Sequence, residues 1–256
     1  MANVLVCIKR VPDVSGQVLL SADGQSVDAR HVGWAVSPHE ECAVELAVQV
    51  AAATGGEATV LSVGSPDAVE QLRDALAVGC TRAVLVEADV DRIGPVDVAA
   101  AIAGVVQEHA TAGTAHDLVL LGNDAADTGD FQVPVRLAYA LNRPVVTGIS
   151  TVEVQGEQVQ AHGDGPAGPE VFELPLPAVV AVMEGGVAPR YPSVMGRMKA
   201  KKVEIETRTA TRDPVGAGRV RLSLPLEQPS QVEILGEGPE SAPAVVDLLE
   251  KLGALR

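Results

Sequence analysis

The sequence is poor in cysteine pairs, in aromatic residues and in positive charge. Its three cysteines, Cys7, Cys42 and Cys80, are far apart and form no CxxC motif, a pattern that favours a reducing compartment over secretion. The 19 Lys and Arg against 34 Asp and Glu give a formal net charge of −15, so we expect no nucleic-acid partner. Neither a signal-peptide pattern nor an uncharged apolar run of about 18 residues occurs. We therefore expect a cytoplasmic protein without membrane insertion.

Motifs for several common chemistries are also missing. The chain has no GxGxxG, GxxxxGK[ST] or GxSxG motif, which argues against a dinucleotide fingerprint, a P-loop and a nucleophile elbow. Its five histidines lack the spacing of metal ligands, so we expect no metal site. We interpret His109 and His116 as solvated residues at a helix end and in a loop, and the cysteines as small buried hydrophobes. No general acid, base and nucleophile assemble, which favours binding over catalysis.

What the chain does contain is an alternation of apolar β-type runs and helical patterns. With 47% hydrophobic and 21% charged residues, its composition is that of a globular protein. Ser37 followed by Pro38 predicts a helix start, and Gly55 its end. Other strands are predicted over residues 4–11, 58–63, 82–87 and 117–121, and other helices over residues 66–79, 96–112 and 131–141. Single helices between buried strands indicate parallel βαβ units, so we predict one doubly wound, mostly parallel α/β domain over residues 1–190.

Two regions read as β structure without intervening helices. Residues 17–28 are predicted to form a hairpin with Asp23 and Gly24 at its turn. Residues 149–162 and 170–182 are predicted β segments on either side of a Gly/Pro turn. Both predictions depend on turn-forming residues between β-type runs.

The C-terminal part of the chain has a different character. Residues 188–238 are rich in Pro, Gly, Arg and Lys and show little periodic structure. An amphipathic helix is predicted over residues 242–252, closed by Gly253. Some 50 residues of mostly irregular chain fit poorly in a compact domain. We therefore predict that residues 191–256 form an extended arm and helix that order against another subunit.

Ligands in an open parallel sheet bind beyond the carboxyl ends of the strands. In this chain the predicted ends lie at Cys7, Gly64 and Gly122. The last of them opens the loop GNDAADTGDFQVP, over residues 122–134, which joins carboxylates and small residues directly before a helix. Its backbone N–H groups can hold a phosphate while its carboxylates accept hydrogen bonds from ribose, or the loop is a plain capped turn. Both interpretations stay open on the residues alone.

Four segments of the chain resemble parts of one known family. They read VLVCIKRVPD, LSVGSPDAVEQLRDALAVGCTRAVLVE, APRYPSVMGRMKAKKVE and EILGEGPESAPAVVDLLEKLGAL. In this order they are similar to the β subunit of electron transfer flavoprotein, including its Fix-type relatives. The resemblance covers nearly the whole chain, which makes it more specific than any single motif.

This resemblance implies a fold of the adenine-nucleotide α-hydrolase type and a place in a heterodimer. The implied partner is an α subunit that carries most of the FAD site, while this subunit holds AMP, or a second FAD in electron-bifurcating members. The implied role is that of an electron carrier, not an enzyme, between flavin dehydrogenases and a quinone-linked oxidoreductase. Two alternatives stay open: a stand-alone nucleotide-binding stress or sensor domain of the same fold, and an ATP-dependent adenylating enzyme.

The resemblance also implies which residues line the nucleotide pocket and which dock on partners. The pocket residues are Cys7, Ser37, Pro38, His39, Glu40, Val63, Gly64, Gly122, Asn123, Asp124, Ala125, Asp127, Thr128, Gly129, Asp130, Phe131, Gln132 and Val133. The docking residues are Arg190, Tyr191, Val194, Met195, Lys199 and Lys202. The pocket departs from the family pattern, because Phe131 is bulky, Pro134 replaces a glycine and Ser37 replaces an asparagine. AMP, FAD and an empty pocket are therefore all open.

Overall fold

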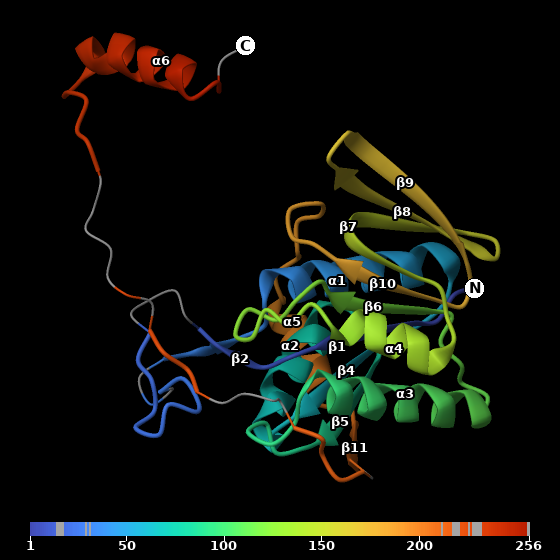
Figure 1. The fold of residues 1–256 in the computed structure, drawn as a ribbon. Coiled ribbons are helices and arrows are strands. Elements are labelled where there is room, and N and C mark those ends of the chain that lie inside the picture. The colour runs from blue at the N-terminus through green and yellow to red at the C-terminus, as the bar shows by residue number, and fades with distance from the viewer. Residues whose placement is uncertain are drawn as a thin grey trace. The chain divides into compact units, whose positions relative to one another are not determined.

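The computed structural model describes residues 1–13, 18–28, 30, 32–210, 212–216, 221–224, 226 and 232–254. The chain forms two compact units, Met1–Leu222 and Ser223–Arg256. The first unit holds the sheet and the helices that cover it (Figure 1). The second unit contains the helix α6 (Ala242–Lys251), which the sequence predicted.

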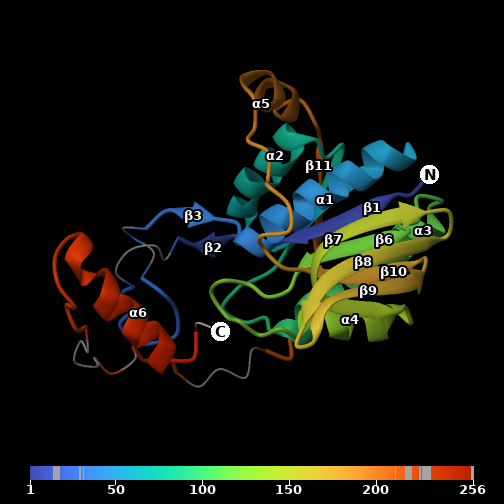
Figure 2. The same ribbon diagram turned by 90° about the horizontal axis from the view of Figure 1, so that it is seen from above.

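The first unit is built on a nine-stranded sheet with the order β11-β5-β4-β1-β6-β10-β7-β8-β9. The strands from β11 to β7 pair in parallel, and β7, β8 and β9 pair antiparallel. Their bounds are β1 Val4–Ile8, β4 Ala58–Gly64, β5 Arg82–Glu87, β6 Leu118–Gly122, β7 Val145–Gln155, β8 Gln158–Gly165, β9 Gly168–Pro175, β10 Ala178–Val182 and β11 Ile205–Thr209. Figure 2 shows the antiparallel strands beside the parallel ones.

Helices cover both faces of this sheet. The helices α1 (Pro38–Thr54) and α2 (Val69–Val78) bury their apolar residues in one core cluster, whereas α3 (Pro95–Thr111) and α4 (Val133–Leu141) contribute to a second. Every residue of β1 and β6 is buried, as expected for strands covered on both sides. The predicted doubly wound α/β fold is therefore confirmed.

The chain changes its winding direction between β1 and β6. From β1 it passes through α1 to β4 and through α2 to β5, towards one edge of the sheet. It then crosses through α3 to β6, on the other side of β1, and builds the rest of the sheet from there. Such a switch point leaves a crevice between the carboxyl ends of the two central strands, where open α/β sheets bind ligands.

Several predicted strands have different bounds in the structure. The strand predicted over residues 4–11 ends at Ile8, and Val11–Pro12 (β2) pairs instead with Trp34–Ala35 (β3). The prediction was wrong here because an apolar run does not show where the chain leaves the sheet. The hairpin predicted over residues 17–28 is confirmed in its described part, where Leu20 pairs with Val27 around Gly24.

The region after Val145, where two β segments were predicted, forms four strands in the structure. Gly156, at φ 61°, forms the turn that separates β7 from β8. The expected turn over residues 163–169 is shorter, because β8 runs to Gly165 and β9 begins at Gly168. The chain then returns as β10, which lies between β6 and β7.

The segment predicted as irregular, residues 188–238, contains a helix and a sheet strand. The helix α5 (Val194–Ala200) lies against α2, where a Cβ added to Gly196 would lie 2.3 Å from the carbonyl oxygen of Ala77 (Figure 2). The strand β11 pairs in parallel with β5 and is therefore part of the sheet. Its residues follow residue 190, where the α/β domain was predicted to end. Both elements are too short to show a clear period in the sequence.

None of the helices that the structure describes has the length and the apolar character of a membrane span.

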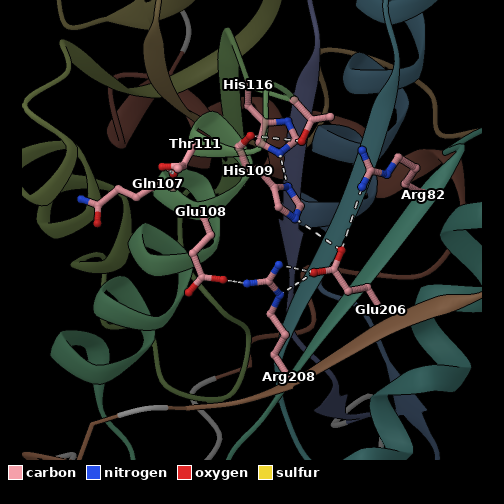
Figure 3. Close-up of polar contacts among 9 residues, drawn as sticks. Arg82, Gln107, Glu108, His109, Thr111, His116, Glu206 and Arg208 are labelled. Atoms are coloured by element: carbon pink, nitrogen blue, oxygen red, sulfur yellow. Dashed lines mark hydrogen bonds and ion pairs between the residues drawn. The ribbon is translucent and has the colours of Figure 1, made fainter.

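The two histidines predicted to be solvated are buried. His109 and His116 are each 3% exposed, and their Nδ1 and Nε2 atoms lie 2.9 Å apart (Figure 3). His109 Nε2 lies 3.4 Å from Glu206 Oε2, and Arg208 joins Glu206 to Glu108. Burial lowers the pKa of His116 to about 4, so this ring is neutral at neutral pH. The prediction was wrong because β11, which carries Glu206, lies beside the end of α3.

The close approach of two backbone segments at the end of α1 gives a test of the fold. A Cβ added to Gly56 would lie 2.0 Å from the carbonyl oxygen of Ala2. The substitution Gly56→Ala should therefore lower the free energy of unfolding by about 1–3 kcal/mol, measured by urea unfolding. The control Gly104→Ala places its methyl group in open space within α3, and should leave stability unchanged or raise it by up to about 1 kcal/mol. Equal unfolding midpoints for the two variants would contradict the close approach.

Candidate functional site

Two close contacts between side chains join the segments that leave the carboxyl ends of the central strands. Lys9 Nζ, just after β1, lies 2.7 Å from Asp127 Oδ1 in the loop after β6. His39 Nδ1, in the first turn of α1, lies 2.7 Å from Asp124 Oδ1 in the same loop. Lys9 and Asp127 are partly exposed, so this ion pair contributes about 0.2–1 kcal/mol, and both contacts mainly position the loop. We call Lys9 together with residues 37–40 and 122–133 the cradle.

Close packing at Gly122 holds the first turn of α1 against the end of β6. A Cβ added to Gly122 would lie 2.7 Å from Glu40 Cγ and 3.3 Å from the Glu40 nitrogen. The next residue, Asn123, donates its backbone N–H to the Val182 carbonyl at 2.8 Å, and its Oδ1 accepts a hydrogen bond from the Gly148 nitrogen at 3.0 Å. The start of the loop is thereby fixed to three neighbouring elements.

The middle of the loop is a turn with small residues. The carbonyl of Ala125 accepts hydrogen bonds from the backbone nitrogens of Thr128 and Gly129, at 3.2 and 2.9 Å. Gly129 has φ 58°, a left-handed conformation that favours glycine. Asp130 follows on the surface. Ala125 and Gly129 are small, so a ligand can approach the backbone of the loop here.

The last residues of the loop, Phe131 and Gln132, take no part in the contacts of Asp124 and Asp127. Phe131 has φ 54°, which is unusual for a bulky residue, and its side chain is 57% exposed. Gln132 Oε1 accepts hydrogen bonds from the guanidinium of Arg136, one turn into the helix that begins at Val133. Phe131 and Gln132 line a cavity of about 610 Å³ with residues of α3 and α4. The structure therefore separates these two predicted pocket residues from the contacts made by Asp124 and Asp127.

The predicted pocket residues on β1 and β4 are buried. Cys7 and Val63 belong to the same core cluster as Leu121, and Gly64 ends β4. Burial raises the pKa of the Cys7 thiol far above its usual value, and the negative charge of the Glu40 carboxylate adds to this increase. Cys7 is therefore a neutral thiol, as is expected for a small buried hydrophobe.

The most perturbed acid in the cradle is Glu40. Its side chain is 6% exposed, and burial raises its pKa from the usual 4.5 to about 8. Hydrogen bonds from the backbone of Lys9 and from Ser37, whose nitrogen lies 3.3 Å from Oε2, only partly oppose this shift. Glu40 is thus mainly protonated at neutral pH. A neutral side chain here leaves the positive end of the α1 dipole available for an anion.

The predicted docking residues lie on and beside α5. Tyr191, Val194 and Met195 are 94%, 79% and 65% exposed, and Lys199 and Lys202 are exposed as well. Ser193 accepts a hydrogen bond from the Gly196 nitrogen and so begins the helix. We call residues 190–202 the docking segment.

Arg190 differs from the other docking residues, because an ion pair holds it. Its guanidinium donates two hydrogen bonds of 2.7 Å to the carboxylate of Glu45, which is 5% exposed. The Arg190 guanidinium lowers the pKa of Glu45, which is therefore charged at neutral pH. This pair fixes the start of the docking segment to α1.

A family model described as the electron transfer flavoprotein domain matches residues 26–213. A protein of Syntrophomonas wolfei named electron transfer flavoprotein subunit beta is 34% identical over 236 residues, which cover 92% of this chain and 90% of that protein. The chain belongs to the electron transfer flavoprotein family.

Two further relatives of this family have the same name. Electron transfer flavoprotein subunit beta of Bacillus subtilis is 34% identical over 206 residues, 80% of this chain and 77% of the relative. The human protein of that name is 34% identical over 208 residues, 80% of each chain. The matched range of the family model includes both the cradle loop and the docking segment.

Two residues at these sites were missing from the predicted set. Lys9 contacts Asp127 and thereby belongs to the cradle; its place directly after the first strand was the only signal for it. Met198 is 61% exposed and extends the apolar surface of Val194 and Met195. Its spacing of three residues from Met195 places both on one side of a helix, but the segment was expected to be a loop.

The raised pKa of Glu40 predicts a pH-dependent stability. Between pH 4.5 and 8 the folded protein keeps a proton that the unfolded chain has lost, so Glu40 should lower stability as the pH rises, by at most about 1.4 kcal/mol per pH unit. In Glu40→Gln this contribution is absent, so the variant should gain stability relative to the wild type across that range. Urea unfolding at pH 5, 6.5 and 8 measures the effect. Glu57→Gln, which changes an exposed carboxylate, is the control and should follow the wild-type profile; the same profile for Glu40→Gln would refute the prediction.

Proposed function

We propose that this chain is the β subunit of an electron transfer flavoprotein that binds AMP in the cradle. The chain would pair with an α subunit that holds the redox-active FAD, and the complex would carry electrons from flavin dehydrogenases to a quinone-linked oxidoreductase. The observation that carries this proposal is the likeness to a β subunit over 92% of the chain, together with the family match that spans the cradle loop and the docking segment.

The residues of the cradle fit an adenine nucleotide. The cradle lies at the switch point of the sheet, where α/β folds bind nucleotides. The start of α1 places the positive end of the helix dipole next to a protonated Glu40, and Lys9, which pairs with Asp127, brings a cation to the same crevice for a phosphate. AMP would supply no chemistry of its own; by bridging the loops after β1 and β6, it would stabilise the folded subunit by mass action.

The apolar face of α6 supports the proposal of a heterodimer. Val245, Val246, Leu248 and Leu252 are between 40% and 70% exposed on this ten-residue helix and its C-cap. Such a face gains stability when another protein covers it. An α subunit that receives the second unit would bury these residues.

The exposed side chains of the docking segment suit a weak and fast contact. Val194, Met195 and Met198 form an apolar centre, and Lys199 and Lys202 lie at its edge. A small apolar anchor within a charged rim gives a short-lived complex whose formation charges can accelerate. An electron carrier needs such a contact, because it must leave one partner before it meets the next.

Removal of cradle side chains tests the nucleotide site. Asp127→Ala breaks the ion pair with Lys9 and should release the loop, so the AMP retained by the purified complex should fall by at least about half. Gln132→Ala removes the contact that holds Arg136 at the start of α4 and should reduce the retained AMP as well. The measurement is chromatography of the nucleotides released on denaturation. Gln158→Ala on β8 is the control, and unchanged AMP content in both cradle variants would place the nucleotide elsewhere.

Removal of the apolar anchor tests the docking segment. Val194→Ala should raise the KM for the complex in reduction by a partner dehydrogenase about tenfold, the effect of losing about 1.4 kcal/mol at a central contact. The FAD content of the complex should stay constant, because Val194 lies on the surface. Val171→Ala, which changes another exposed valine on β9, should keep the wild-type KM. Loss of FAD in Val194→Ala would instead assign the segment a structural role.

A further inference from the structure

A groove beside the docking segment is separate from the cradle. It has a volume of about 310 Å³ and lies between α1, α2 and residues 189–192. Its walls are mainly apolar, and they include Val44, Ala75 and Val78, with Trp34 and Tyr191 as aromatic side chains. A groove of this size holds one large side chain or a small ligand.

Gln71 on α2 lines this groove and lacks a hydrogen bond. The side chain is 5% exposed, and its Oε1 has no hydrogen-bond partner among the residues that the structure describes. An unpaired buried acceptor of this kind costs about 1–3 kcal/mol. A ligand that places an N–H group in the groove would remove this cost.

The charged residues of the groove leave one carboxylate unpaired. Glu45 is paired with Arg190 at 2.7 Å, and Asp74 with Arg197 at 3.3 Å. Glu41, which also lines the groove, has no ion pair within the described ranges. Partial burial raises the pKa of Glu41, because no cation compensates for the water it has lost. Glu41 is therefore the carboxylate of the groove that a further cation can pair with, since the nearby Arg10 guanidinium stacks on Trp34, 3.8 Å from the centre of its ring.

We propose that this groove binds the side chain of an arginine on the protein that docks at residues 190–202. The aliphatic part of the arginine would lie against Val44, Ala75 and Val78, and its guanidinium would donate hydrogen bonds to Glu41 and to Gln71 Oε1. Arginine suits two separate acceptors better than lysine, because its planar group carries five N–H donors in a fixed arrangement. The inference rests on the proposed docking function.

Continuity of the surface supports this occupant. The wall formed by Arg190, Tyr191 and Pro192 leads within two residues to the exposed Val194. A protein that covers Val194 therefore also reaches the mouth of the groove. Val194 would supply the apolar contact, and the groove would add a charged one that selects among partners.

The ligand class can be tested on the complex with its α subunit. Trp34 is the only tryptophan of this chain and lines the groove, so a 5-fluorotryptophan at this position reports occupancy by ¹⁹F NMR; Trp34→Phe identifies its resonance. Capped arginine amide should shift this resonance with a Kd on the order of 1 mM. The uncharged isostere, capped citrulline amide, should bind at least about tenfold more weakly. Equal shifts from both probes, tighter binding of capped lysine amide, or no shift would overturn the proposal.

Matched variants connect the groove with docking. Glu41→Gln and Glu57→Gln each remove one negative charge, but only Glu41 lines the groove. Glu41→Gln should weaken binding of the arginine probe and raise the KM for dehydrogenase-driven reduction, each about tenfold, whereas Glu57→Gln should change neither by more than about twofold. Gln71→Leu should weaken the probe while stability is kept or raised, since the buried acceptor is removed.

The outcomes separate this inference from the proposed function. If Val194→Ala raises the KM and Glu41→Gln does not, docking at the segment holds and the arginine site is refuted. If neither variant changes electron transfer, docking at this segment is refuted together with the arginine that depends on it. Equal effects of Glu41→Gln and Glu57→Gln would indicate long-range attraction by net charge and would also refute the arginine site.

Discussion

The contact between the first turn of α1 and the end of β6 is the constraint on which the rest of the cradle depends. Gly122 has no side chain, and Glu40 occupies the space that a Cβ would take. The same contact buries Glu40, keeps it protonated at neutral pH and brings His39 within reach of Asp124. One close approach between a helix and a strand end therefore determines the width of the crevice, its charge and the position of its loop. With a larger residue at Gly122, all three would change together.

The parts of the fold that the sequence predicted are those with strong local signals. The central strands are continuous apolar runs, and the helix α1 has a proline at its start and Gly55 at its end. The parts that were missed depend on contacts between distant residues. β11 has an alternating, half-exposed pattern and becomes a strand because β5 offers an unpaired edge. The error at His109 followed in part from this, since its ring contacts Glu206 of the same strand, and His116 contacts His109.

The candidate site was predicted to a similar extent. Residue order in a parallel sheet was enough to bring the ends of β1 and β6 and the start of α1 together, and Asp124 and Asp127 lie there. What order could not predict is the direction of single side chains. Gln132 pairs with Arg136, one turn further along α4, and Arg190 pairs with Glu45, 145 residues away. Each of these residues has several possible partners of suitable charge close to it in the sequence, so only the packed structure determines which one it pairs with.

The position of β10 has a consequence for the synthesis of the chain. β6 is paired on one side by β1 and on the other by β10, which comes about 60 residues later, after β7, β8 and β9 (Figure 1). While the ribosome makes the intervening residues, the apolar strand β6 has an open edge that can pair with another nascent chain. The β7–β8–β9 meander contains only local pairings and can form first. Arrival of β10 then joins β6 to this meander, and β11 pairs with β5 later still, so protection of the strand edges from aggregation comes late in translation.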